Sequence, residues 1–153
     1  MLFPVSGIYE THLSVQDRQR SVKFYSETLG LPLAKEIVER DVTFFWVDES
    51  MKGLLGIWGS KSQNPCVSGR GHFAFSVELN VLRTAADTLK SKGIEPLSID
   101  GTPVAEPIVI CWMPAVSIYF NDPDGNSLEI IHMLNDLAQP ELGIVSLSEW
   151  ERK

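Results

Sequence analysis

The segments Tyr9-Glu10-Thr11-His12-Leu13-Ser14-Val15 and Gly71-His72-Phe73-Ala74-Phe75-Ser76-Val77 can be laid over one another, with Val15 on Val77. Each reads as a strand. Each leads into a helix-like segment that ends at a glycine, Gly30 in the first half and Gly93 in the second. In this register the two glycines agree within one residue. The sequence therefore predicts two copies of one structural module.

The residues around these segments predict the same order in each half, which is strand, helix and three strands. In the first half we expect a strand at 8–15, a helix capped by Asp17 and carrying Val22, Tyr25 and Leu29, and strands at 33–39, 42–47 and 53–58. In the second half we expect a strand at 72–78, a helix capped by Asn80, and strands at 95–99, 116–120 and 127–133. The run Asp122-Pro123-Asp124-Gly125 predicts a hairpin turn.

This order predicts an α+β fold made of two tandem βαβββ modules. The modules cover about 5–60 and 70–134, joined by a linker at 60–70, within a single domain over 1–134. A tail at 135–153 lies beyond the second module, and its apolar residues indicate that it packs on the domain or on a neighbouring subunit.

The amino-acid composition and net charge exclude several classes of binding partner. The 153 residues are 44% hydrophobic and 22% charged, which is typical of a globular domain with a core of its own. The net charge of −7 and the lack of a basic cluster argue against a nucleic-acid partner. No apolar run approaches the roughly 20 residues of a membrane span, and no signal peptide is evident. Cys66 and Cys111 have no Cys-x-x-Cys spacing, so we expect reduced thiols in a cytoplasmic protein.

The overlay of the two halves also singles out four positions. Glu10 falls on His72, and a second match of Leu55-Gly56-Ile57 with Leu128-Glu129-Ile130 places Gly56 on Glu129. If a pseudo-two-fold axis relates the modules, these four positions converge on it. Three of them hold side chains that can bind a metal, so the sequence predicts one metal between the modules.

In its sequence motifs the chain resembles the vicinal oxygen chelate superfamily, which includes glyoxalase I, extradiol dioxygenases and bleomycin-binding resistance proteins. The resemblance covers about 7–134 and implies a mixed eight-stranded open barrel, the glyoxalase/bleomycin resistance/dihydroxybiphenyl dioxygenase fold. Its motifs are specific for the fold and weak for the reaction, because this fold hosts many chemistries. The motifs are Tyr9 to Val15, Ser21-Val22-Lys23-Phe24-Tyr25, Leu29-Gly30-Leu31, Gly71 to Val77 and Asp122 to Glu129.

The resemblance implies metal ligands on the first strand of each module and on the last strand of one or both. His72 and Glu129 match their motifs directly. The first-strand ligand of the family is usually His or Gln, and Glu10 at that place is a departure. The family's fourth ligand is a glutamate in enzymes such as glyoxalase I, and Gly56 takes its place. His12 lies on the same strand face as Glu10, because side chains alternate along a strand.

Two coordination schemes follow, each with one divalent ion. Glu10, His72 and Glu129 would suit Mn, Fe, Ni or Zn, and the strand register favours this set. His12, His72 and Glu129 would form the two-His, one-carboxylate triad associated with non-haem Fe(II) and O₂ chemistry. In the first scheme His12 is a proton-transfer group or a partner of a ligand. Glu10 and His12 could also simply pair with one another without binding a metal, and His72 could have a structural role only.

We expect a substrate pocket that includes His12, Trp58 and Trp112, although both tryptophans could equally be core residues. The function predicted is a metal-dependent lyase or isomerase acting on a small substrate that chelates the metal through two oxygens. The metal would act as a Lewis acid, and Glu10, Glu129 or His12 would move the proton, with His12 and Glu129 as the candidate catalytic residues. The alternatives are an Fe(II) extradiol-type dioxygenase and a metal-free drug-binding protein of the bleomycin-resistance type. A small-molecule substrate and a homodimer are expected, with no nucleic-acid or membrane partner.

Overall fold

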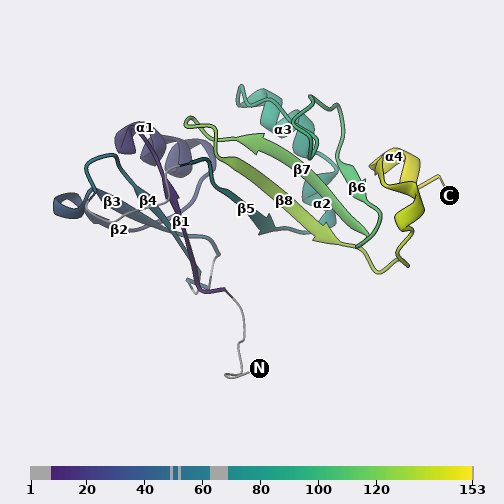
Figure 1. Cartoon of the computed structure of the whole chain (residues 1–153), viewed down its shortest axis with the longest axis horizontal. Helices are drawn as coiled ribbons and strands as arrows, with labels where there is room; N and C mark the ends of the chain where they lie inside the picture. The colour runs from purple at the N-terminus through teal and green to yellow at the C-terminus, as the bar shows by residue number, and fades with distance from the viewer. Residues whose placement is uncertain (1–7, 49, 52, 63–68, 153) are drawn as a thin grey trace, which may run out of the picture. The chain divides into compact units, whose positions relative to one another are not determined.

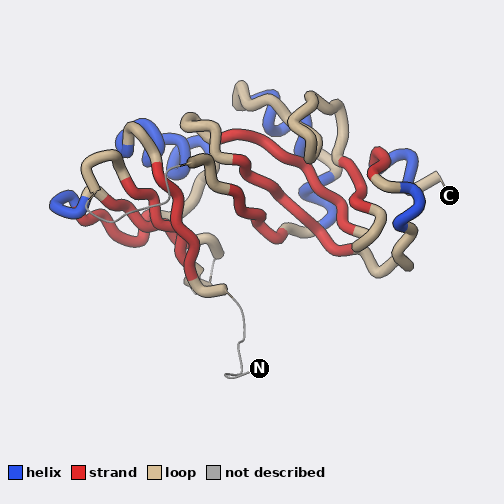
Figure 2. Tube along the Cα trace, in the orientation of Figure 1, coloured by secondary structure: helices blue, strands red, loops and turns tan. Residues whose placement is uncertain are grey.

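The computed structural model describes residues 8–48, 50–51, 53–62 and 69–152. The chain divides into two compact units, unit 1 (Met1–Gly71 with Asp122–Asn126) and unit 2 (His72–Asn121 with Ser127–Lys153). Each unit pairs one sheet with its own helices (Figures 1 and 2). Among the residues that the structure describes, no helix has the length and apolar character needed to cross a membrane.

Unit 1 is a four-stranded mixed sheet with the strand order β1-β4-β3-β2. Strands β1 and β4 pair in parallel, and the pairs β4–β3 and β3–β2 are antiparallel. Its elements are β1 (Glu10–Ser14), α1 (Arg18–Lys23), a π-helical turn (Phe24–Thr28), β2 (Leu33–Ile37), a 3-10 turn (Val38–Arg40), β3 (Val42–Trp46) and β4 (Leu54–Trp58).

The two faces of this sheet differ because side chains alternate along each strand. Leu13, Phe45, Leu55 and Ile57 are buried, and the ring of Phe45 lies 6.0 Å from that of Tyr25 in the helical segment. This face forms the core of unit 1. The even-numbered residues of β1 and β4 lie on the opposite face, and those of β1, Glu10 and His12, have partly exposed side chains.

The turn at Asp122–Asn126 belongs to unit 1 and is held there by a buried hydrogen-bond network. The Tyr25 hydroxyl donates to Asp122 Oδ2 at 2.9 Å, and Asn126 Nδ2 donates to the same oxygen at 2.8 Å. The Gly71 N–H donates to Asn126 Oδ1 at 2.8 Å. Burial, followed by the charge of Asp122, raises the pKa of Tyr25 far above its ordinary value. The phenol is therefore the hydrogen-bond donor in this network.

Unit 2 is a five-stranded sheet with the order β5-β8-β7-β6-β9, in which only β5 and β8 pair in parallel. Its elements are β5 (His72–Ser76), α2 (Leu79–Leu82), α3 (Ala85–Ser91), β6 (Ile108–Ile110), β7 (Ala115–Asn121), β8 (Ser127–Met133), a 3-10 turn (Pro140–Leu142), β9 (Ile144–Ser146) and α4 (Leu147–Trp150). Its core is apolar and includes Leu82, Val116, Ile118 and Leu128, which are fully buried.

Two expectations for unit 2 are wrong in detail. The strand predicted at 95–99 is a loop in which Leu97 makes isolated bridges, because Pro96 and Pro103 lack the N–H that a ladder needs. Asn80 lies inside α2, whose N-cap is Glu78. The predicted linker at 60–70 lies largely outside the described residues.

Residues 135–153 contribute to the second sheet. β9 pairs with β6 in antiparallel fashion, from Ile108↔Ser146 to Ile110↔Ile144. The side chains of Leu147 and Trp150 in α4 are 5% and 7% exposed. The tail is thus a structural part of unit 2, and it supplies a strand beyond the eight that the modules predicted.

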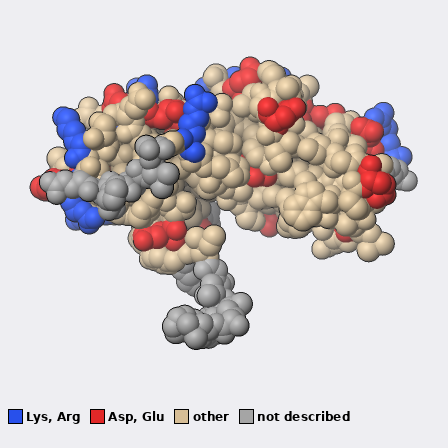
Figure 3. Space-filling model, viewed as in Figure 1, with Lys and Arg blue, Asp and Glu red and all other residues tan. Residues whose placement is uncertain are grey.

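The α+β fold with open, mixed sheets is confirmed, since neither sheet closes on itself. Internal symmetry is also visible in the pairing. In unit 1 the parallel pair is formed by the first and fourth strands, and in unit 2 by β5 and β8, the first and last strands of the second module. On the face shown in Figure 3, Lys and Arg lie in separate small groups among Asp and Glu.

Candidate functional site

In unit 2, a histidine and a buried carboxylate meet on adjacent parallel strands. Glu129 in β8 is only 4% exposed, and its Oε2 lies 3.4 Å from Nε2 of His72 in β5. Its Oε1 accepts a hydrogen bond of 2.5 Å from the hydroxyl of Ser117 in β7. Among the described residues, His72 is its only ion-pair partner. A carboxylate buried without Lys or Arg is costly unless it is hydrogen-bonded, so the contacts of Glu129 need an explanation beyond packing.

The ring of His72 is oriented by its own surroundings. Its Nδ1 donates to the carbonyl of Ser127 at 3.1 Å, and the ring stacks on Tyr119 with 5.9 Å between centroids. Nε2 is then the ring nitrogen that faces Oε2 of Glu129. This is the arrangement that a metal-binding histidine requires.

Tyr119 completes the surroundings of Glu129. The two residues are paired across β7 and β8. Burial, then the charge of Glu129 and a hydrogen bond to it, raise the pKa of Tyr119. The phenol of Tyr119 therefore acts as a hydrogen-bond donor to the carboxylate.

In unit 1, the corresponding face of the sheet carries a second histidine and carboxylate pair. His12 Nε2 lies 3.6 Å from Glu10 Oε2, and both side chains are partly exposed. The His12 ring is flanked by Phe44 and Trp58, at centroid distances of 6.0 and 5.5 Å. The position of the imidazole is thus set by aromatic contacts within the unit.

The two tryptophans expected in the pocket have different positions. Trp58 is buried beside His12, its indole N–H has no hydrogen-bond partner in the described structure, and Arg40 lies 5.1 Å over its ring. Trp112 is 64% exposed in the turn between β6 and β7. That turn leads into Ala115, which pairs with Met133, about 13 Å along β8 from Glu129. The structure brings Trp58 to a candidate site residue and leaves Trp112 at the far end of the strand.

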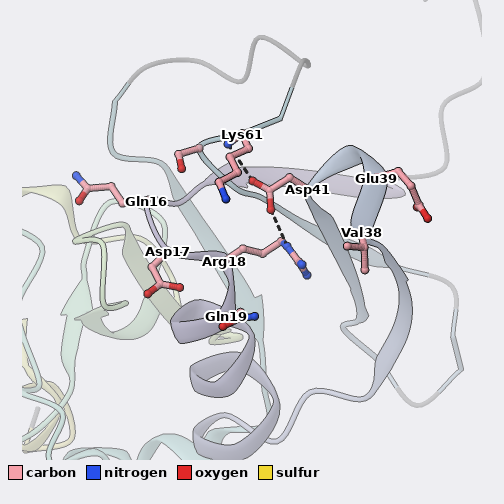
Figure 4. Close-up of a pocket in the computed structure, with 9 residues that line it drawn as sticks. Gln16, Asp17, Arg18, Gln19, Val38, Glu39, Asp41 and Lys61 are labelled. Carbon is pink, nitrogen blue, oxygen red and sulfur yellow. Dashed lines mark hydrogen bonds and ion pairs between the residues drawn. The ribbon is translucent and has the colours of Figure 1, made fainter.

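A polar pocket in unit 1 contains none of the predicted site residues (Figure 4). Its walls come from the start of α1, the β2–β3 turn and the residues after β4. Arg18 is satisfied there by Asp41 at 2.8 Å, Glu36 at 2.5 Å and Thr43 at 2.7 Å. These contacts tie α1 to β2 and β3, so the cluster is structural.

No group of three or more His, Cys, Asp or Glu side chains within the described residues could hold a metal ion. Each unit by itself supplies one imidazole and one carboxylate. The chemistry of these donors nevertheless fits a divalent ion of borderline hardness.

A family model for the glyoxalase/bleomycin resistance protein/dioxygenase superfamily matches residues 7–130. The chain belongs to this superfamily. Members typically use a divalent metal and bind small-molecule substrates. The suspected relationship to vicinal oxygen chelate proteins is thereby confirmed.

Several solved structures share the fold of this chain. An integron cassette protein, HFX_CASS4, from the mobile metagenome of the Halifax Harbour sewage outfall is 28% identical, with a TM-score of 0.70 over 84% of this chain and 100% of that one. Lactoylglutathione lyase from Agrobacterium tumefaciens is 21% identical, with a TM-score of 0.66 over 84% and 95%. The oxidase ChaP-H2 is 18% identical, with a TM-score of 0.63 over 86% and 96%. At these last two identities the likeness establishes the fold alone.

Two residues of this superfamily member were not anticipated from its sequence, namely Ser117 and Tyr119. Both lie in the otherwise apolar strand β7 and alternate with buried Val116, Ile118 and Phe120. Polar side chains at period two in an apolar strand were the signal that could have identified them.

Proposed function

We propose that this chain is a divalent-metal-dependent lyase or isomerase acting on a small substrate with two adjacent oxygens. Glu10, His72 and Glu129 are the metal ligands in this proposal. The observation that carries it is the buried Glu129 carboxylate beside an imidazole whose Nδ1 is committed to a backbone carbonyl. Mn, Fe, Ni and Zn all suit such ligands.

When bound, the metal supplies Lewis-acid stabilisation of negative charge on the substrate oxygens. The protein's own residues handle the proton. Glu129 takes it from the carbon beside the carbonyl and returns it to the neighbouring carbon, so that substrate and product are isomers. Ser117 donates to Oε1, which leaves Oε2 as the oxygen that accepts the proton.

His12 is the second candidate for proton transfer in this proposal. Its Nε2 lies beside Glu10, and its side chain is about one-third exposed, so it can exchange protons with solvent. Phe44 and Trp58 flank the ring, and Trp58 would add an apolar wall for the substrate.

The test is solvent-deuterium incorporation in D₂O by the metal-loaded protein. The probes are small 2-hydroxycarbonyl compounds and lactoylglutathione, with catechol in parallel. We expect deuterium at the carbon beside the carbonyl of at least one probe, abolished by chelator. The Glu129→Gln variant is expected to lose about 100-fold or more of this rate, because it cannot accept a proton. Glu95→Gln, at an exposed position of unit 2, is the matched control.

Other outcomes would contradict the proposal. Opening of the catechol ring with O₂ uptake would establish the extradiol-type dioxygenase instead. Tight binding of a large drug such as bleomycin, without metal and without turnover, would establish a binding protein of the resistance type.

A cytoplasmic homodimer remains the expected setting. Cys111 is a free, buried thiol, which fits a reducing compartment, and Cys66 lies outside the described residues. Sedimentation analysis of the purified chain would test the dimer directly.

A further inference from the structure

A cavity in unit 2 is built mainly by the part of the chain that follows the family match. The superfamily model ends at residue 130, and every described residue that lines this cavity comes after it, except Leu79 in α2. The tail and α4 lie at one end of the unit 2 sheet (Figure 1). The shared fold therefore assigns no role to this cavity, and its lining has to indicate what it binds.

The apolar part of the lining is held in place by the rest of unit 2. It consists of four side chains, Leu79, Leu134, Leu147 and Trp150. The Leu134 N–H donates to the Pro114 carbonyl at 2.8 Å, and the Leu147 N–H donates to the Pro107 carbonyl at 2.9 Å. The cavity volume of about 500 Å³ lies within the range of roughly 300–1,000 Å³ that is usual for small-molecule sites. The cavity is thus large enough for a small apolar group, on walls that are already ordered.

The polar part of the lining carries negative charge. Asp136, Gln139 and Glu151 line the cavity, and no Lys or Arg does so among the residues that the structure describes. Glu151 is paired with Arg83, whereas no ion pair to Asp136 is found within the described part of the chain. The Gln139 side chain adds an amide oxygen, and its backbone N–H donates to the Cys111 carbonyl at 2.9 Å. These groups favour a cationic ligand over an anionic one.

We propose that this cavity binds a small organic cation, a primary amine that carries an apolar body about the size of a phenyl ring. The ammonium group donates to the Asp136 carboxylate and to the Gln139 amide oxygen, as a charged donor of several hydrogen bonds. The apolar body lies against the leucine side chains, and the Trp150 ring attracts the cation over its face. None of His12, His72 and Glu129 lines the cavity, so the inference does not depend on the proposed function.

The experiment compares three probes that share a phenyl ring and differ in charge. The purified full chain is titrated by calorimetry with 2-phenylethylamine, with neutral 2-phenylethanol and with anionic 3-phenylpropanoate. We expect the amine to bind at least about tenfold more tightly than the alcohol, because only the amine makes hydrogen bonds between charged groups. No binding of the anion is expected.

Two variants at exposed positions test the role of the charge. Asp136→Asn keeps the shape of the side chain and removes its charge, so it is expected to weaken amine binding about fivefold or more and to leave alcohol binding unchanged. Glu141→Gln is the matched control, because it removes one charge from the tail at a position that does not line the cavity. It is expected to bind the amine as the unaltered chain does.

Three results would overturn the inference. The first is no binding of the amine up to about 10 mM. The second is equal affinity for amine and alcohol, or an unchanged amine affinity in Asp136→Asn. The third is a dimer in sedimentation analysis to which the amine does not bind, since a second copy of the chain would then cover the cavity. Metal content and deuterium incorporation are measured separately, so failure here leaves the proposed function standing, and the reverse also holds.

Discussion

At the scale of single residues, the Asp124 carboxylate is a buried charge whose hydrogen bonds stabilise the fold of unit 1. Its side chain is 6% exposed, and it accepts from the Gln16 N–H at 3.0 Å, Arg20 at 2.8 Å and the Ser21 hydroxyl at 3.0 Å. Burial alone would raise the pKa of Asp124, but the hydrogen bonds and the charge of Arg20 together lower it below its ordinary value. A lowered pKa contributes stability above the ordinary aspartate value, and that stability is lost as pH falls through the folded-state pKa.

The Asp124→Asn variant is therefore expected to lose about 1–3 kcal/mol of unfolding free energy at pH 7. The difference from the unaltered protein should shrink as the pH falls below about 4, where the Asp124 carboxylate of the unfolded chain takes up a proton before that of the folded protein. Urea unfolding at pH 7 and pH 3 measures this, with the exposed Asp136→Asn as control. A difference that stays constant with pH would show that the charge of Asp124 contributes nothing.

How far the sequence predicts individual site residues depends on what positions them. Glu129 could be predicted because a glutamate in an apolar strand needs a partner. The neighbours Ser117 and Tyr119 could not be assigned to it, because their contact depends on the β7–β8 register. The role of Gly56 as room for the His12 ring could not be predicted either, since it depends on the parallel pairing of β1 and β4.

At the scale of elements, strands with regular alternation were predicted well and those set by tertiary contacts were not. The first strand of each module and the β7–β8 hairpin follow the sequence pattern closely. Strand β6 is only three residues long and lies between β7 and β9. It owes its extended form to these two neighbours, and a local pattern of three apolar residues does not specify them.

The tail offers a test at this scale, because Leu147 anchors α4 to unit 2. Its side chain is 5% exposed, and its N–H donates to the Pro107 carbonyl at 2.9 Å. We expect Leu147→Ala to lower the free energy of unfolding by about 2–5 kcal/mol, since it leaves a cavity. Leu137→Ala, at a position 86% exposed, is the matched control and should change little. Equal, small effects in urea unfolding would mean that α4 does not pack on unit 2 in solution.

At the scale of the whole molecule, the repeated module is the feature that sequence predicts best. The glycines at the helix ends, Gly30 and Gly93, both adopt a positive φ, 77° and 72°, as their shared place in the repeat requires. The repeat also supplies the functional hypothesis, because each unit holds one imidazole beside one carboxylate, on β1 in unit 1 and on β5 and β8 in unit 2. The reaction does not follow from the repeat, since relatives with this fold include a lyase and an oxidase.

The central claim is the proposal that Glu10, His72 and Glu129 are the ligands of one divalent metal per chain. The direct measurement is the metal content of purified protein, by inductively coupled plasma mass spectrometry, after growth with added Mn, Fe, Ni and Zn. We predict close to one divalent ion per chain, with the content strongly reduced in His72→Ala and in Glu129→Gln. A chain that retains its fold by circular dichroism but carries no stoichiometric metal under any of these conditions would contradict the claim.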